Sequence, residues 1–155
     1  MSSVNHDLVH VFDLLGAALT VGKRAMEAEV ADEPHHLRGS HLRLLSLTPV
    51  EGMRPTDLAG RVGMTKQSLG EFVATMQKTG FLHVDPDPTD RRARIVRPTV
   101  KGLRLQARIM EIFAETEDRW RSEIGDRDWA TFRRVLAHIA DRNGRDRPHA
   151  NSAEG

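Results

Sequence analysis

A charged turn that contains prolines lies between two short runs, residues 81–84 and 93–97, in which apolar and polar side chains alternate. This alternation predicts a β-hairpin whose tip carries Asp90, Arg91 and Arg92 into solvent. The planar side chain of an arginine can enter a narrow, electronegative minor groove, and a carboxylate two residues earlier can hold its guanidinium group. We interpret Asp90 and Arg92 as such a pair, with Arg91 and Arg94 beside them. A solvated hairpin whose charges only protect a sheet edge is the alternative.

The segment upstream of the hairpin favours the DNA-binding interpretation. Residues 56–62 are expected to form an amphipathic helix with Thr56 as its N-cap, followed by a tight turn at Gly63. A second helix is expected over residues 65–79, where apolar side chains recur at helical spacing, and Gly80 ends it. Two short helices joined by a glycine turn are typical of the helix-turn-helix, whose second helix enters the major groove.

The first turns of this second helix, the reader helix, carry polar side chains on the outward face. Such side chains can reach phosphates and base edges in a major groove. The candidate DNA-binding residues of the helix are Thr65, which is also expected to cap it, Lys66, Gln67, Ser68 and Glu71.

Helix, turn, helix and a two-stranded wing together resemble the MarR-type transcriptional regulators. The resemblance is carried by residues 58–68, residues 77–82 and above all residues 87–92, with Thr99 and Gly102 following at the family's spacing. It implies a fold that is mainly α with a small β-wing, and a winged helix-turn-helix core flanked by N- and C-terminal helices that form a dimerisation layer. It also implies a transcriptional regulator that binds double-stranded DNA as a homodimer. Repression is expected because a protein on a promoter blocks polymerase, although activation stays open.

The segments on either side of the core have helical patterns of their own. Apolar residues recur at steps of four and three through residues 5–29, and two similar patterns follow the wing at residues 101–124 and 128–143. The expected organisation is an N-terminal dimerisation helix (1–36), the DNA-binding core (37–100, with the wing at 82–98), C-terminal dimerisation helices (101–143) and a disordered tail (144–155). Terminal helices that pack on the core of a monomer are the alternative to a dimer.

Charge is unevenly distributed along the chain. Residues 54–104 carry ten lysines and arginines against five acidic residues, a net charge of +5, whereas the rest has thirteen against seventeen. The positive charge therefore gathers where the reader helix and wing are expected, and it attracts a polyanion such as DNA. The other class of function that we consider is a winged helix kept as a protein-interaction adaptor. Lys66, Arg91, Arg92 and Arg94 favour DNA over that alternative.

Several other functions find little support in the sequence. It has no cysteine, which excludes disulfides and thiolate catalysis, and it has neither a glycine-rich phosphate loop nor a nucleophile elbow. We therefore expect no enzyme activity and no cofactor. No apolar run approaches the length that spans a bilayer, so we expect a cytoplasmic protein without a membrane partner.

A histidine-rich segment at residues 34–45, which opens a helix upstream of the helix-turn-helix, raises a further hypothesis. Glu33, His35, His36 and His41 could bind a divalent metal, but adjacent histidines point in different directions on a helix and five residues separate His36 from His41, so no metal ligand is assigned. Arg38 and His41 are instead candidate ligand-binding residues. Members of the resembled family take up small aromatic acids near this point, and a guanidinium or imidazole group can bind a carboxylate. Exposed polar residues at a helix start are the alternative.

Overall fold

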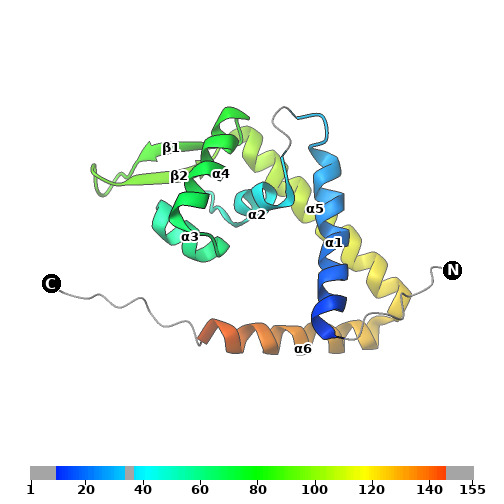
Figure 1. Ribbon diagram of the computed structural model, residues 1–155. Helices are drawn as coiled ribbons and strands as arrows, with labels where there is room; N and C mark the ends of the chain where they lie inside the picture. The colour runs from blue at the N-terminus through cyan, green and yellow to red at the C-terminus, as the bar shows by residue number, and fades with distance from the viewer. Residues whose placement is uncertain (1–9, 34–36, 146–155) are drawn as a thin grey trace. The chain divides into compact units, whose positions relative to one another are not determined.

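The computed structural model describes residues 10–33 and 37–145 of the chain. Its elements are α1 (Val11–Glu29), α2 (Gly39–Leu47), α3 (Pro55–Val62), α4 (Lys66–Lys78), β1 (Leu82–Pro86), β2 (Arg94–Pro98), α5 (Val100–Ile124) and α6 (Asp126–Arg145) (Figure 1). The chain divides into two units, Met1–Phe113 and Ala114–Gly155, so α5 begins in the first unit and ends in the second.

One apolar core holds the first unit together. Its most completely buried side chains are Leu42, Leu44, Leu45, Leu58, Leu69, Met76, Leu82, Val96 and Ile109. They come from α2, α3, α4, both strands and α5. Full burial of one such side chain stabilises a fold by about 1.5 to 3 kcal/mol. The helix-turn-helix and the wing therefore share a single core, and the predicted winged helix fold is confirmed.

The N-cap of helix α3 lies two residues earlier than its sequence pattern indicates. Arg54 is the N-cap and Pro55 is the first helical residue, so the prediction of Thr56 as the N-cap is wrong. Proline suits the first helical position because its φ is already helical and the missing N–H would have no helical partner there. The helix ends at Gly63, whose positive φ of 78° suits glycine. This tight turn leads into α4 as predicted.

The limits of α4 follow from its two ends. The hydroxyl group of Thr65 accepts a hydrogen bond from the backbone N–H of Ser68 at 3.1 Å, which satisfies one of the unpaired donors of the first turn. At the other end, Gly80 has a φ of 77°, and the N–H of Phe81 donates to the carbonyl of Met76 at 2.8 Å. Both predicted boundary signals of the reader helix are confirmed.

The wing is an antiparallel pair of strands, β1 and β2, in which Leu82 lies opposite Pro98. The first strand ends at Pro86. A third segment joins the wing at the middle of β2, because Met53 and Val96 exchange two backbone hydrogen bonds of 2.9 Å each. This bridge ties the wing to the loop that precedes α3.

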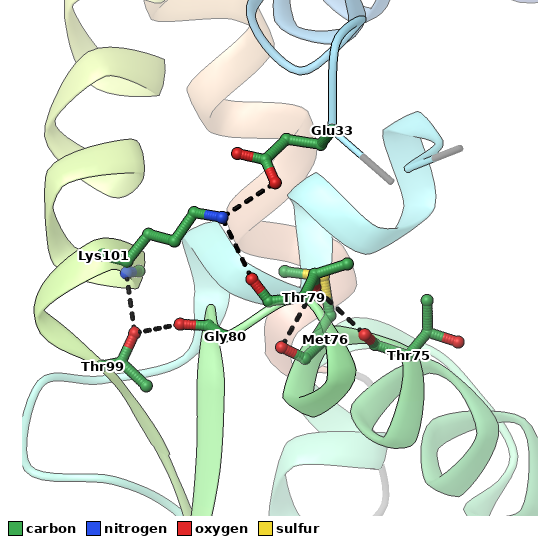
Figure 2. A network of polar contacts seen from close by, with 8 residues as sticks. Glu33, Thr75, Met76, Thr79, Gly80, Thr99 and Lys101 are labelled. Carbon is green, nitrogen blue, oxygen red and sulfur yellow. Dashed lines mark hydrogen bonds and ion pairs between the residues drawn. The ribbon is translucent and has the colours of Figure 1, made fainter. Parts of the chain in front are cut away.

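The threonine and glycine that follow the wing close the junction between α4 and α5 (Figure 2). The hydroxyl group of Thr99 donates to the carbonyl of Gly80 at 2.5 Å and accepts from the N–H of Gly102 at 3.0 Å. A Cβ atom on Gly102 would lie 2.1 Å from the carbonyl oxygen of Phe81, so only glycine fits there. The amino group of Lys101 donates to Glu33 at 2.8 Å and to the carbonyl of Thr79 at 3.1 Å. This junction fixes the end of α4 to the start of α5.

Thr99→Val is expected to lower the free energy of unfolding by about 1 to 3 kcal/mol, because valine keeps the shape but leaves two partly buried backbone groups without a partner. Urea unfolding of the purified variant measures this change. Thr56→Val, at an exposed position in the first turn of α3, is the matched control. Equal losses in the two variants would contradict a specific role for the Thr99 hydroxyl.

Helix α1 buries only part of its apolar stripe. Met26 is buried, whereas Phe12 and Leu19 are 85% and 74% exposed. Leu8, the first residue of the predicted stripe, lies outside the described residues. The exposed apolar side chains of α1 are Val11, Phe12, Leu14, Leu19 and Val21. The single chain therefore leaves much of this face without apolar contacts.

The second unit contains the end of α5 and the whole of α6. The helix predicted over residues 128–143 begins two residues earlier, at Asp126, and continues to Arg145, two residues into the segment predicted to be a tail. The rest of that segment lies outside the described residues. Within the described chain, no helix has both the length and the apolar character that crossing a bilayer requires. The exposed apolar side chains of α6 are Phe132, Val135, Leu136 and Ile139.

Candidate nucleic-acid interface

The outward face of α4 combines exposed polar side chains with a structured first turn. Lys66, Gln67 and Glu71 are exposed, while Leu69 and Val73 on the opposite face are buried. This arrangement follows from the helical period, which separates a core-facing stripe from a solvent-facing one. The helix can therefore present its outward face to a partner without losing core contacts.

Two of the predicted reader residues have a structural role in the first turn. The hydroxyl group of Thr65 donates to that of Ser68 at 2.9 Å, and it also accepts from the Ser68 N–H. These hydroxyl groups complete the helix cap. Lys66 and Gln67, which lie between them, carry the long exposed side chains of this turn. Four of the five predicted reader residues therefore lie at this helix end, where Thr65 and Ser68 are hydrogen-bonded to each other and Lys66 and Gln67 are exposed.

Asp87 anchors the wing turn to the start of α3. Its side chain is buried, and one carboxylate oxygen accepts from the N–H and hydroxyl group of Thr89 at 2.8 and 2.7 Å. The other oxygen accepts from Nε of Arg54 at 2.7 Å. The hydrogen bonds from Thr89, followed by that from Arg54, lower the pKa of Asp87 to about 2. Sequence reasoning missed this pair, since Arg54 precedes Asp87 by 33 residues with no local signal that joins them.

Asp90 acts on Arg92 through the backbone. One oxygen of its carboxylate accepts from the N–H of Arg92 at 3.0 Å. The other lies 3.9 Å from the guanidinium group of Arg54, which is its ion-pair partner. This geometry differs from the expected pairing with the guanidinium group of Arg92. Asp90 thus orders the turn that carries Arg92, and a side-chain pairing on DNA stays a prediction.

The tip of the wing presents three arginine side chains. Arg91 and Arg92 lie in the turn and Arg94 begins β2, and all three are exposed. The hairpin extends away from the helices of its own unit, so its tip is accessible (Figure 1). A unit that carries both a cationic wing tip and an exposed polar helix face can contact phosphates and a groove together.

An acid titration tests the anchoring role of Asp87. Its folded-state pKa of about 2 lies below the ordinary value of 3.8, so its contribution to stability is complete above pH 4 and is lost as the pH falls towards 2. Asp87→Asn is therefore expected to be less stable than wild type at pH 7, with the difference shrinking below pH 4. Urea unfolding across this range measures the difference, and Asp32→Asn, at an exposed loop position, is the control. A difference that is independent of pH would contradict the assignment.

The structure brings Arg38 and His41 together at the start of α2. The backbone N–H of Arg38 donates to Nδ1 of His41 at 3.1 Å, and the imidazole ring packs on Phe72 of α4 with ring centroids 4.4 Å apart. Burial, and then the charge of Arg38, lower the pKa of His41, so the ring is favoured in its neutral form. Only Nε2 of His41 and the exposed guanidinium group of Arg38 are left to bind an anion.

A carboxylate from α1 also lies at this helix end, which the sequence did not indicate. Glu27 accepts a hydrogen bond of 2.7 Å from the N–H of Gly39, the first residue of α2. Among residues 10–33 and 37–145, no group of three or more His, Cys, Asp or Glu side chains could hold a metal ion. His35 and His36, from the metal hypothesis, lie outside these ranges.

The chain is similar in sequence and structure to known regulators. Residues 40–93 match the model of the MarR family. A crystal structure of MarR aligns with a TM-score of 0.76 at 20% identity, over 94% of this chain and 98% of that one. A MarR transcriptional regulator from Methanosarcina mazei Go1 aligns with a TM-score of 0.70 at 18% identity, over 86% and 95% of the two chains. A MarR-family regulator from Rhodococcus sp. RHA1 aligns at 0.64 and 21%, over 85% and 96%. No curated protein sequence matches at a significant level.

Proposed function

We propose that this chain, which has the winged helix-turn-helix fold of the MarR-type proteins and matches their family model over residues 40–93, is a cytoplasmic homodimeric repressor that binds a palindromic operator. The observation that carries the proposal is the pairing of an exposed polar reader face on α4 with an exposed cationic wing tip. In this arrangement α4 enters the major groove and the wing reaches the flanking minor groove.

Each predicted DNA contact has a distinct part in this proposal. Lys66 binds phosphate and Gln67 reads a base edge. Thr65 and Ser68 stabilise the first turn of α4 and bind the sugar-phosphate backbone of the DNA. Glu71 extends the reading face by one turn. Arg92 enters the minor groove, and Arg91 and Arg94 bind its phosphate walls.

The exposed apolar side chains of α1 and α6 support the homodimer. Val11, Phe12 and Leu19 in α1, and Leu136 and Ile139 in α6, are large apolar groups that remain in contact with water in the single chain. Apolar patches of this kind commonly mark protein interfaces. A two-fold dimer presents two copies of α4 to successive major grooves about 34 to 36 Å apart. The operator is then an imperfect palindrome.

Release of the operator by a small aromatic or anionic ligand completes the proposal. The Arg38 guanidinium group and the Nε2–H of His41 supply hydrogen-bond donors for a carboxylate, and the ring contact between His41 and Phe72 joins that position to α4. A ligand bound there could change the separation of the two reader helices in the dimer, and so weaken binding.

Selection of bound sequences from a random duplex pool tests the proposed function. The selected sequence is expected to be a palindrome with half-sites one helical turn apart. A salt titration on this sequence and on scrambled DNA then separates specific binding from phosphate binding, because the latter falls steeply with salt. Absence of any enriched sequence would overturn the operator proposal and favour the adaptor function.

A further inference from the structure

Gly70 lies in the middle of the reader face. It is exposed in α4, one turn beyond Lys66 and Gln67 and one turn before the exposed Ala74. A Cβ atom built on Gly70 meets nothing within 4 Å. The packing of α4 on its neighbours therefore leaves this position empty.

Nothing in the described chain calls for glycine at this position. Gly63 and Gly80 have positive φ values, and Gly102 lies against a carbonyl oxygen, but Gly70 is a helical residue with open space around it. Alanine is intrinsically better than glycine inside a helix because glycine loses more backbone entropy on folding. The fold would be more stable with alanine here, so folding stability does not explain the glycine, and a contact made by α4 does.

We propose that Gly70 is a specificity-determining position that lets the α4 backbone approach a thymine in the major groove. This inference rests on the proposed function, since it takes α4 as the reader helix. The C5-methyl group of thymine projects into the major groove and is recognised by close apolar contact. The Cα of Gly70 and the methyl group of Ala74, one turn apart, form a small apolar surface that fits it.

The neighbouring side chains add to this arrangement. Gln67 and Glu71 flank Gly70 on the exposed face, and their side chains end in an amide and a carboxylate group. A close approach of the helix axis to the groove floor brings both side chains within reach of base edges. A methyl group added at Gly70 would meet the thymine methyl first and hold these side chains away.

Gly70→Ala is expected to raise the melting temperature by about 1 to 4 °C, since it removes a helical glycine without a clash. The same variant is expected to bind the selected operator about tenfold or more weakly, because the added methyl group overpacks the contact. Gly60→Ala is the matched control, since Gly60 is also helical, exposed and without neighbours within 4 Å, but lies in α3. It should raise the melting temperature with little change in operator affinity.

Thymine-to-deoxyuridine substitution then identifies the contact. Each operator thymine is replaced in turn, which removes only the C5-methyl group. At one position in each half-site, this change should weaken wild-type binding and strengthen binding by Gly70→Ala, because the missing methyl group makes room for the new one. Binding is measured by fluorescence anisotropy with labelled duplexes.

The outcomes separate this inference from the proposed function. If wild type selects an operator and Gly70→Ala binds it equally well, or if no deoxyuridine position restores the variant, the inference is wrong and the proposed function stands. Equal loss of affinity in Gly60→Ala also overturns it, because the effect would then follow from added stability. If the wild-type protein selects no operator, both the inference about Gly70 and the proposed function are wrong.

Discussion

Ile139→Glu is expected to convert a dimeric protein into a monomer and to weaken operator binding by about two orders of magnitude or more, because the second half-site no longer binds intramolecularly. Ile139 is 51% exposed on α6, on the same side of the helix as Phe132, Val135 and Leu136. A carboxylate in the centre of an apolar interface has to lose its hydration without an opposite charge.

Arg134→Glu is the matched control for this dimer test. Arg134 is exposed on α6, and the helical period places it opposite the apolar side chains. Sedimentation equilibrium measures the association state, and anisotropy measures operator affinity. The proposed interface is wrong if wild type is a monomer, if Ile139→Glu stays dimeric, or if Arg134→Glu dissociates to the same extent.

Arg92→Ala is expected to weaken operator binding by on the order of 1 to 3 kcal/mol and to lower the salt slope by about one. Arg92 is exposed in the wing turn, and Asp90 fixes the backbone of that turn by accepting the Arg92 N–H. The guanidinium group is therefore presented from an ordered turn, so less conformational entropy is lost when it binds. The loss should be largest on operators with A·T pairs flanking the half-site, where the minor groove is narrow.

Two comparisons make the Arg92 result specific. Arg43→Ala removes an exposed arginine of α2 and should leave the operator affinity near that of wild type. Asp90→Asn should weaken binding less than Arg92→Ala, because an amide oxygen can still accept the backbone N–H. Unchanged affinity and salt slope in Arg92→Ala would show that the wing tip does not contact DNA.

The sequence by itself determined the helix-turn-helix and the wing. The N-cap at Thr65, the positive-φ glycines Gly63 and Gly80, and the helical and alternating periods are all local signals. Each constrains backbone conformation within a few residues, so it is visible without knowledge of the neighbours in space. The boundary at Thr56 was wrong because two local preferences competed, and proline at the first helical position prevailed.

Only the tertiary structure decided how these elements are joined. The hydrogen bonds from Arg54 to Asp87, from Gly39 to Glu27 and between Met53 and Val96 link residues that are distant in sequence. An arginine or a glutamate has many partners of suitable chemistry, and the choice depends on which backbone positions the folded core brings within hydrogen-bond distance. The empty space at Gly70 has the same origin, because the surroundings of a residue are set by the packing of whole helices, whereas its own helical conformation is set locally.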